Sequence, residues 1–148
     1  MIKFPPRKGA FLQCDFRGFI EPEMTKKRPV IVISTPDLHG EGNKLATIVP
    51  LSTTTPDPVR EYHYLLKNIP IFPYYDSSEA WVKCDMIYTV SFERLSLFYR
   101  GKLPNGKRNY IYESVSDEDF KRIKECVAKG VGVRYRSYAS LNILSFNT

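Results

Sequence analysis

The sequence has few of the residues that a metal enzyme or a disulfide-bonded protein needs. Its 148 residues include two histidines and three cysteines. His39 and His63 have no potential ligand at regular spacing, and Cys-x-x-Cys, P-loop and Gly-x-Gly-x-x-Gly motifs are absent. We therefore predict no metal site and no cofactor. The cysteines Cys14, Cys84 and Cys126 are odd in number and widely spaced, which favours buried thiols in a reducing cytosol over a disulfide framework.

Long apolar segments are also missing. No run approaches the roughly 20 residues that a bilayer-spanning helix requires. The first residues, MIKFPPRKGAFLQ, lack the apolar core of a secretory signal. No internal repeat, low-complexity segment or interdomain linker occurs. We therefore expect a cytoplasmic protein that forms one domain and does not associate with membranes.

Positive charge is in excess. The chain has 22 Lys and Arg against 16 Asp and Glu, which gives a formal net charge of +6 and a pI of about 9.2. This balance favours a polyanionic partner, nucleic acid before others. Many soluble proteins are mildly basic, so the charge does not decide the function alone. The hydrophobic fraction of 43% fits one compact domain with a sizeable core.

Short apolar stretches separated by turns predict a mainly β fold. We predict a first strand at residues 10–16 and a second at 28–35. Val30–Ile33 is apolar at every position, so this strand should be buried on both faces. A turn at 35–43 then leads to a third strand at 45–49, which should pair antiparallel with the second. Further strands are predicted at 61–66 (an edge strand), 80–90 (with a bend near Cys84 and Asp85) and 110–112, with an irregular segment at 68–78 and a tight turn at 104–107. Residues 92–99 form either a further strand or a short turn that leads into one.

One helix is predicted near the C-terminus. Ser116 can cap it, and Asp119 stands where the acid of a capping box is found. Phe120, Ile123 and Val127 then recur on one face, and Gly130 is a suitable end. Residues 131–148 could pack on the domain, join a partner or stay mobile. Short strands followed by a helix imply a small, curled antiparallel sheet.

The stretch from Cys14 to Ser34 carries the strongest functional signal. A strand leads into a loop whose acids, among them Glu23, give way to Lys26, Lys27 and Arg28. Pro29 then opens the buried second strand, and the third strand ends in Val-Pro-Leu-Ser-Thr at residues 49–53. A charged loop at the mouth of a stiff strand pair is a common place for a functional site.

This order of features resembles the PemK/MazF family of toxin endoribonucleases. A strand, an acidic-to-basic loop ending in Arg-Pro and a Val-Pro-x-Ser/Thr strand end follow one another in both. The resemblance covers about residues 8–130 and is best over 9–54 and 80–97. It implies an SH3-like β-barrel with a C-terminal helix, which makes one domain of residues 1–148 with an extension at 131–148.

The resemblance also implies a function. Family members act as toxins that cut single-stranded mRNA at selected sequences without a metal, leaving 2′,3′-cyclic phosphate and 5′-hydroxyl ends and inhibiting growth. It implies a homodimer and an antitoxin protein whose disordered acidic tail covers the RNA groove. The alternative is a barrel with the same scaffold that binds nucleic acid or protein without catalysis.

The family's working residues correspond here to Arg28, Ser52 and Glu23. The Arg28 guanidinium offers paired donors that match phosphate oxygens and keeps its charge, so charge stabilisation suits it better than proton donation. Glu23 could accept a proton or orient Arg28. The hydroxyl could come from Ser52 or from Thr53 beside it. RNA contacts are predicted for Lys26, Lys27, Asp15 and Thr54.

Each of these residues also has a structural alternative. Arg28 could pair with Asp15 or Glu23 at the strand mouth, Glu23 could be solvated and idle, and Ser52 with Thr53 could be turn residues. Asp85 lies in an apolar stretch, where a buried carboxylate would be costly unless hydrogen-bonded, so a structural role in fixing a loop is favoured for it. A Ser-His-Asp arrangement with His63 stays open, although nothing favours it. Unpaired bases could stack on exposed aromatic rings, but a core position is the better expectation for most of Trp81, Tyr62, Tyr64, Tyr74 and Tyr75.

Overall fold

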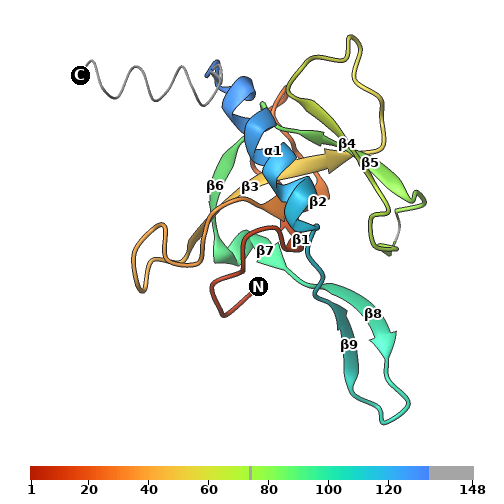
Figure 1. Ribbon diagram of the computed structural model, residues 1–148. Coiled ribbons are helices and arrows are strands. Elements are labelled where there is room, and N and C mark those ends of the chain that lie inside the picture. The colour runs from red at the N-terminus through yellow and green to blue at the C-terminus, as the bar shows by residue number, and fades with distance from the viewer. Residues whose placement is uncertain (74, 134–148) are drawn as a thin grey trace.

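The computed structural model describes residues 1–73 and 75–133, so Tyr74 and most of the predicted C-terminal extension lie outside the described residues. Within them the chain forms short β-strands followed by one α-helix (Figure 1). The strands are β1 Phe11–Asp15, β2 Lys27–Val32, β3 Leu45–Ser52, β4 His63–Lys67, β5 Glu79–Lys83, β6 Tyr88–Ser91, β7 Leu95–Ser96, β8 Phe98–Lys102 and β9 Arg108–Ile111; the helix α1 is Asp117–Gly130, and a 3₁₀ turn, η1, covers Phe92–Arg94.

Seven of these strands make one antiparallel sheet. Its order is β4-β5-β3-β2-β1-β7, and β6 also pairs with β3. The long strand β3 serves two neighbours, because Leu51 and Ser52 pair with β5 while residues 45–48 pair with β6. Among the described residues β4 and β7 do not pair with each other, so the curled sheet is an open barrel. The predicted mainly β class with a C-terminal helix is confirmed.

The predicted hairpin of the second and third strands is also confirmed. Val30 pairs with Pro50 and Val32 with Ile48, and β4 lies at the sheet edge as expected. Val30 and Val32 lie in one buried cluster and Ile31 in another, so β2 is buried on both faces. This burial explains why its sequence does not alternate between polar and apolar residues.

The predicted strand at 80–90 is divided by a turn. β5 ends at Lys83, a turn covers Cys84 and Asp85, and β6 begins at Tyr88. Asp85 is exposed in this turn, so it is not a buried carboxylate. Ending the strand before the acid leaves the carboxylate in water and avoids the cost of its desolvation.

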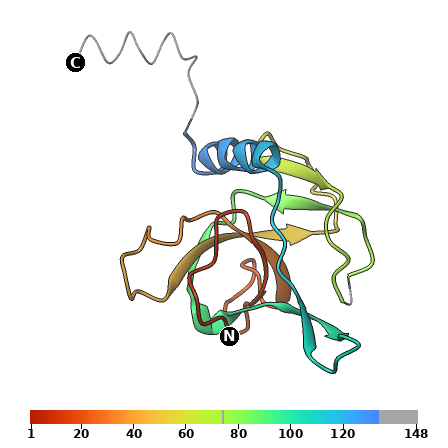
Figure 2. The ribbon, with the colours of Figure 1, turned by 60° about the horizontal axis from the view of Figure 1, so that its bottom comes forward.

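Helix α1 begins and ends as predicted. The Asp119 backbone N–H donates to Ser116 Oγ at 3.1 Å, and the helix buries Phe120, Ile123 and Cys126. Gly130 is its last residue. A Cβ at this position would collide with the backbone carbonyl of Cys84, so only glycine allows this close approach. Figure 2 shows α1 lying across the sheet.

The β8–β9 hairpin projects away from the barrel (Figures 1 and 2). Its strands pair antiparallel, and the tip contains the predicted turn at residues 104–107. Phe98 and Ile111 are buried at its base. All three cysteines are free and buried. None of the helices in the described part of the chain is long and apolar enough to cross a bilayer.

Candidate functional site

A cavity of about 620 Å³ lies between the loop after β1 and the ends of β2, β3 and β5. Its walls are mostly polar or charged. They are formed by Glu21, Pro22, Glu23, Met24, Thr25, Lys26, Arg28, Ser52, Thr54, Lys83 and Met86.

The strand register brings Arg28 and Ser52 together. Val30 pairs with Pro50 in the antiparallel β2–β3 ladder. Continuing this register outward by two residues on each strand places Arg28 opposite Ser52. Side chains of directly opposed residues lie on the same face of a sheet, and both of these residues line the cavity.

No hydrogen bond or ion pair of the Arg28 side chain is found among residues 1–73 and 75–133. Its Nε is buried without a hydrogen-bond acceptor, and none of the ion pairs found there includes it. Asp15 pairs with Arg17 instead, at 2.6 Å, and Glu23 Oε2 accepts the Ile20 N–H at 3.3 Å. The structure therefore does not show the alternative pairing of Arg28 with Asp15 or Glu23. An unmet buried donor costs about 1–3 kcal/mol, which an anion in the cavity could offset.

The loop that forms one wall is anchored through Tyr88 of β6. The Met24 backbone N–H donates to Tyr88 Oη at 3.1 Å. The Tyr88 ring packs against Phe16 and Phe19, with centroid distances of 5.0 and 5.6 Å. These contacts fix the direction in which the loop leaves β1 and returns to β2.

Arg94 holds the same loop from the other side of the sheet. Its Nη1 donates to the backbone carbonyls of Asp15 and Arg17, both at 2.9 Å. Its guanidinium also lies 4.6 Å from the centroid of the Phe19 ring, a favourable cation–π contact. The Arg94 guanidinium thus stabilises the fold through contacts within the protein.

Ser52 and the two threonines after it are placed differently. Ser52 is 7% exposed, and its Oγ accepts the Thr54 N–H at 3.2 Å. No hydrogen bond donated by the Ser52 hydroxyl is found within the described residues, so its proton is available to a ligand in the cavity. Thr54 also lines the cavity, whereas Thr53 is exposed and does not.

Of the other predicted residues, Glu23 and Lys26 line the cavity, but Asp15 and Lys27 do not. Those two line a separate hollow of about 160 Å³ that Arg94 also lines. Successive residues of a strand point to opposite faces, so Lys27 and Arg28 separate. Hydrogen bonds from Arg17 are the main reason that the pKa of Asp15 is lowered to about 2.

Sequence reasoning missed Lys83, which lines the cavity from the end of β5. The pairing of Ser52 with Trp81 brings this end of β5 beside β3. Lys83 is two residues from Trp81 and therefore lies on the same face. The predicted strand included Lys83 just before its expected bend near Cys84 and Asp85, and nothing in the sequence indicated a cavity wall here.

The histidines have partners of their own. His63 Nδ1 accepts the Arg60 N–H at 2.9 Å, and His39 Nε2 lies 3.0 Å from Thr47 Oγ1. Neither lines the cavity, so the structure gives no support to a Ser-His-Asp arrangement with Ser52. Within residues 1–73 and 75–133, no group of three or more His, Cys, Asp and Glu side chains could hold a metal ion.

Most of the aromatic residues considered for base stacking serve the fold. Tyr64 Oη donates to Asp119 Oδ1 at 2.5 Å. Burial, followed by this hydrogen bond, raises the pKa of Tyr64 to about 12. Tyr75 packs against the core, and Tyr62 against His63. Trp81 is half-buried.

The comparison with known families agrees with this arrangement. Residues 7–130 match the family described as PemK-like, MazF-like toxins of type II toxin–antitoxin systems. The chain belongs to this family. The resemblance drawn from the Arg-Pro and Val-Pro-x-Ser motifs is therefore confirmed. We refer to the protein below as a PemK/MazF-like protein.

Relatives and solved structures extend this result. The PemK/MazF-like protein is 33% identical over 125 residues to the uncharacterized protein YifN of Escherichia coli, covering 69% of this chain and 80% of that one. It is 32% identical over 107 residues to an uncharacterized protein of Haemophilus influenzae, covering 64% and 70% of the two chains. MazF from Deinococcus radiodurans has a similar fold, with a TM-score of 0.60, 13% identity and coverage of 88% and 100%. A mycobacterial endoribonuclease solved with its cognate antitoxin is similar at a TM-score of 0.58, 17% identity and coverage of 88% and 99%.

Proposed function

We propose that this PemK/MazF-like protein is a toxin that cleaves single-stranded mRNA at selected sequences without a metal ion, and so inhibits growth. The observation that carries the proposal is the Arg28 guanidinium, which has no partner among the described residues and shares an approximately 620 Å³ cavity with the Ser52 hydroxyl. Structural likeness at 13–17% identity supports the fold alone, so the chemistry is argued from this cavity.

The reaction uses the ribose of the substrate as the nucleophile. A bond forms between the 2′ oxygen and the adjacent phosphorus, and the bond from phosphorus to the 5′ oxygen breaks. The 2′-hydroxyl proton passes to a base, and another proton passes to the leaving 5′ oxygen. The products are a 2′,3′-cyclic phosphate and a 5′-hydroxyl, and negative charge on the non-bridging oxygens must be stabilised on the way.

Arg28 and Ser52 provide that stabilisation. The planar guanidinium offers parallel N–H donors that match two oxygens of one phosphate. The Ser52 hydroxyl, from a residue that lines the same cavity as Arg28, donates to a non-bridging oxygen. Ser52 is held by the hydrogen bond from the Thr54 N–H, so the donor is positioned before the substrate arrives.

The remaining charged groups of the cavity move protons and attract the RNA. Glu23 takes the proton of the 2′-hydroxyl, since its carboxylate lines the cavity. The ammonium groups of Lys26 and Lys83 line the same cavity and can protonate the 5′ oxygen or bind neighbouring phosphates. The roles first considered for Lys27 and Asp15 are limited to the neighbouring hollow, outside the reacting linkage.

We also propose that the protein is one cytoplasmic domain that acts as a homodimer and is inhibited by an antitoxin with an acidic tail. A net charge of +6 suits both RNA and an acidic protein. The mycobacterial neighbour was solved with its cognate antitoxin, and MazF of Deinococcus radiodurans with MazE, which supports a partner of this kind here.

Incubating the purified protein with a long RNA in EDTA tests the proposal. We expect discrete fragments with 5′-hydroxyl and 2′,3′-cyclic phosphate ends, and mapping these ends identifies the preferred sequence. RNA that is retained without being cut would contradict the proposal and favour a binding barrel. Cleavage that appears only when a divalent cation is supplied would refute the metal-independent mechanism.

A further inference from the structure

A second surface suited to RNA lies on the β8–β9 hairpin, which projects from the barrel (Figure 1). Phe98 pairs with Ile111 at its base, and both are buried. The next pair is Tyr99 with Tyr110, which points to the opposite face because side chains alternate along a strand. These two rings are 46% and 43% exposed, and their centroids are 5.9 Å apart.

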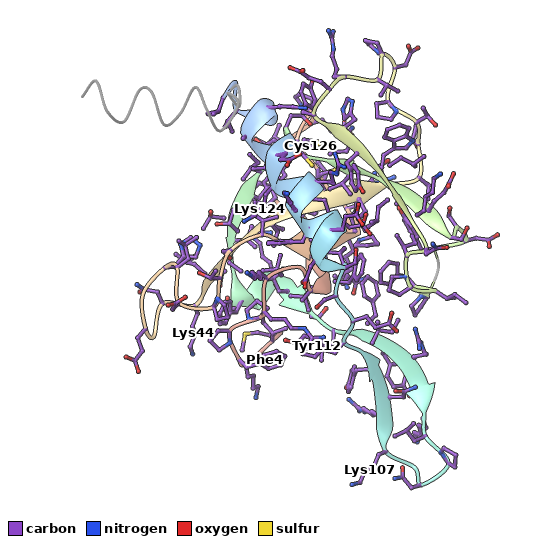
Figure 3. The ribbon with its side chains drawn as sticks, in the orientation of Figure 1. Phe4, Lys44, Lys107, Tyr112, Lys124 and Cys126 are labelled. Carbon is purple, nitrogen blue, oxygen red and sulfur yellow. The ribbon has the colours of Figure 1, made fainter. Side chains whose placement is uncertain are left out.

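Cationic side chains share this face with the tyrosines. Arg108 is two residues from Tyr110 along β9, so it lies on the same face. Lys102 is the cross-strand partner of Arg108 and points the same way. Both are exposed. Residues 98–111 contain no Asp or Glu, and a further cation, Lys107, lies at the tip of the hairpin (Figure 3).

A hollow beside Tyr99 has mostly apolar walls. Its volume is about 570 Å³, and it is lined by Ile71, Phe72, Pro73, Tyr99 and Arg100. Ile71 is 82% exposed, which is a high value for a large aliphatic side chain. Within the described residues Arg100 forms an ion pair with Glu113, at 3.7 Å and with both side chains exposed, so its guanidinium can turn toward a ligand. A flat ring that stacks against apolar walls beside a cation fits this hollow.

We propose that this surface, formed by Tyr99, Lys102, Arg108 and Tyr110 together with the adjacent hollow, binds single-stranded RNA outside the scissile linkage. The inference rests on the proposed function, because it assigns a further subsite to the same substrate. Exposed rings offer stacking platforms to bases, and interleaved cations follow the phosphate backbone. An acidic peptide would use the cations but has no need of two paired aromatic rings and an apolar hollow.

Binding of RNA that cannot be cleaved tests this surface separately from catalysis. Fluorescent 2′-O-methyl oligonucleotides of about 5 and about 20 nucleotides serve as probes, since their sugars lack the nucleophile. Tyr99→Ala/Tyr110→Ala should weaken binding of the longer probe about tenfold or more. The shorter probe should bind with nearly unchanged affinity. Tyr99→Phe/Tyr110→Phe keeps both rings and should bind like the wild type.

The two cations are tested through salt dependence. Lys102→Gln/Arg108→Gln should reduce the slope of log affinity against log salt for the longer probe by roughly 1.4, the value for two phosphate contacts on a single strand. Lys121→Gln/Arg122→Gln removes the same charges from exposed positions of α1 and serves as the matched control. The control should leave the slope unchanged.

The outcomes are separable from those of the cleavage test. Unchanged affinity of both hairpin variants for the longer probe, with circular dichroism like that of the wild type, would overturn the inference. So would an equal loss in the α1 control, or unchanged RNA binding together with lost binding of poly-L-glutamate, which would assign the surface to an acidic protein. If the wild-type protein cuts RNA but the hairpin substitutions do not alter RNA binding, only the proposed subsite is refuted. If the protein binds RNA through the hairpin but does not cut it, only the proposed catalysis is refuted.

Discussion

Lys27 and Arg28 are neighbours in β2, yet their side chains enter different surroundings. On the Lys27 side, the charges near the strand end are satisfied within the protein. Asp15 pairs with Arg17, and Arg94 donates to two backbone carbonyls. On the Arg28 side, a buried guanidinium nitrogen has no acceptor among the described residues. Native proteins pair nearly all buried polar groups, and exceptions call for an explanation.

This difference separates charges that hold the fold from a charge kept for a ligand. Removing a satisfied group should cost stability and affect activity indirectly. Removing an unsatisfied group should cost activity without lowering stability, because no protein hydrogen bond is lost and an unmet buried donor is removed. We therefore predict opposite results for Arg28 and for Arg94, which lines the hollow on the Lys27 side.

Arg28→Ala should have the largest effect. We expect the single-turnover rate of RNA cleavage to fall by about 10²–10³-fold, as when a donor to a developing oxyanion is removed, while the melting temperature does not fall. Arg17→Ala is the matched control, because it removes an exposed arginine from the other side and should keep the cleavage rate. Undiminished cleavage by Arg28→Ala would contradict the claim that Arg28 serves the ligand and not the fold.

Arg94→Ala should have the reverse pattern. Loss of two charge-assisted hydrogen bonds and the contact with Phe19 should lower the free energy of unfolding by about 1.5–3 kcal/mol, measured by urea denaturation. Arg100→Ala, which removes only the exposed pair with Glu113, should change it by less than about 1 kcal/mol. Equal stability of the two variants would show that Arg94 does not hold the loop.

Ser52→Ala and Thr53→Ala decide which hydroxyl works. Ser52 lines the cavity and Thr53 does not, so only the first change should slow cleavage, by about tenfold for one neutral hydrogen bond. The comparison uses initial rates on the same RNA at saturating protein. Slower cleavage by the Thr53 variant with an unaffected Ser52 variant would contradict this prediction and assign the working hydroxyl to Thr53, outside the cavity.

Asp15→Asn should have the smallest effect, visible only in acid. Because Arg17 lowers the pKa of Asp15 to about 2 in the folded protein, the folded state binds fewer protons there than the unfolded state. The stability from this pair is therefore complete above a pH of about 4 and is lost as the pH falls through about 2. The free energy of unfolding should fall less steeply with acid in the variant. Identical slopes would show that the pair does not form in solution.

Local patterns predicted the parts of the fold that depend on neighbouring residues. The apolar run at Val30–Ile33 predicted a buried strand, and Ser116 predicted the start of the helix, each from a few consecutive residues. A bend near Cys84 and Asp85 was predicted, but the sequence did not predict that a turn there divides the stretch into two separate strands. The turn exists because β3 pairs with β5 and β6 at different positions and because α1 approaches it closely at Gly130.

The local sequence likewise predicted some residues of the candidate site but not all of them. Arg28 and Ser52 were named from a motif, and both line the same cavity. The separation of Lys27 from Arg28 could have been predicted from the alternation of a strand. Lys83 could not, because its position depends on the long-range pairing of β5 with the end of β3.

The central claim is that Arg28 lacks a protein partner because it binds RNA phosphate, and the Nε–H resonances of the arginines test it directly. Titration with a 2′-O-methyl oligonucleotide should shift the Arg28 resonance strongly and slow its exchange with water, while the Arg94 resonance stays in place. A bound oligonucleotide that leaves Arg28 unchanged and moves Arg94 or Arg17 instead would contradict the account.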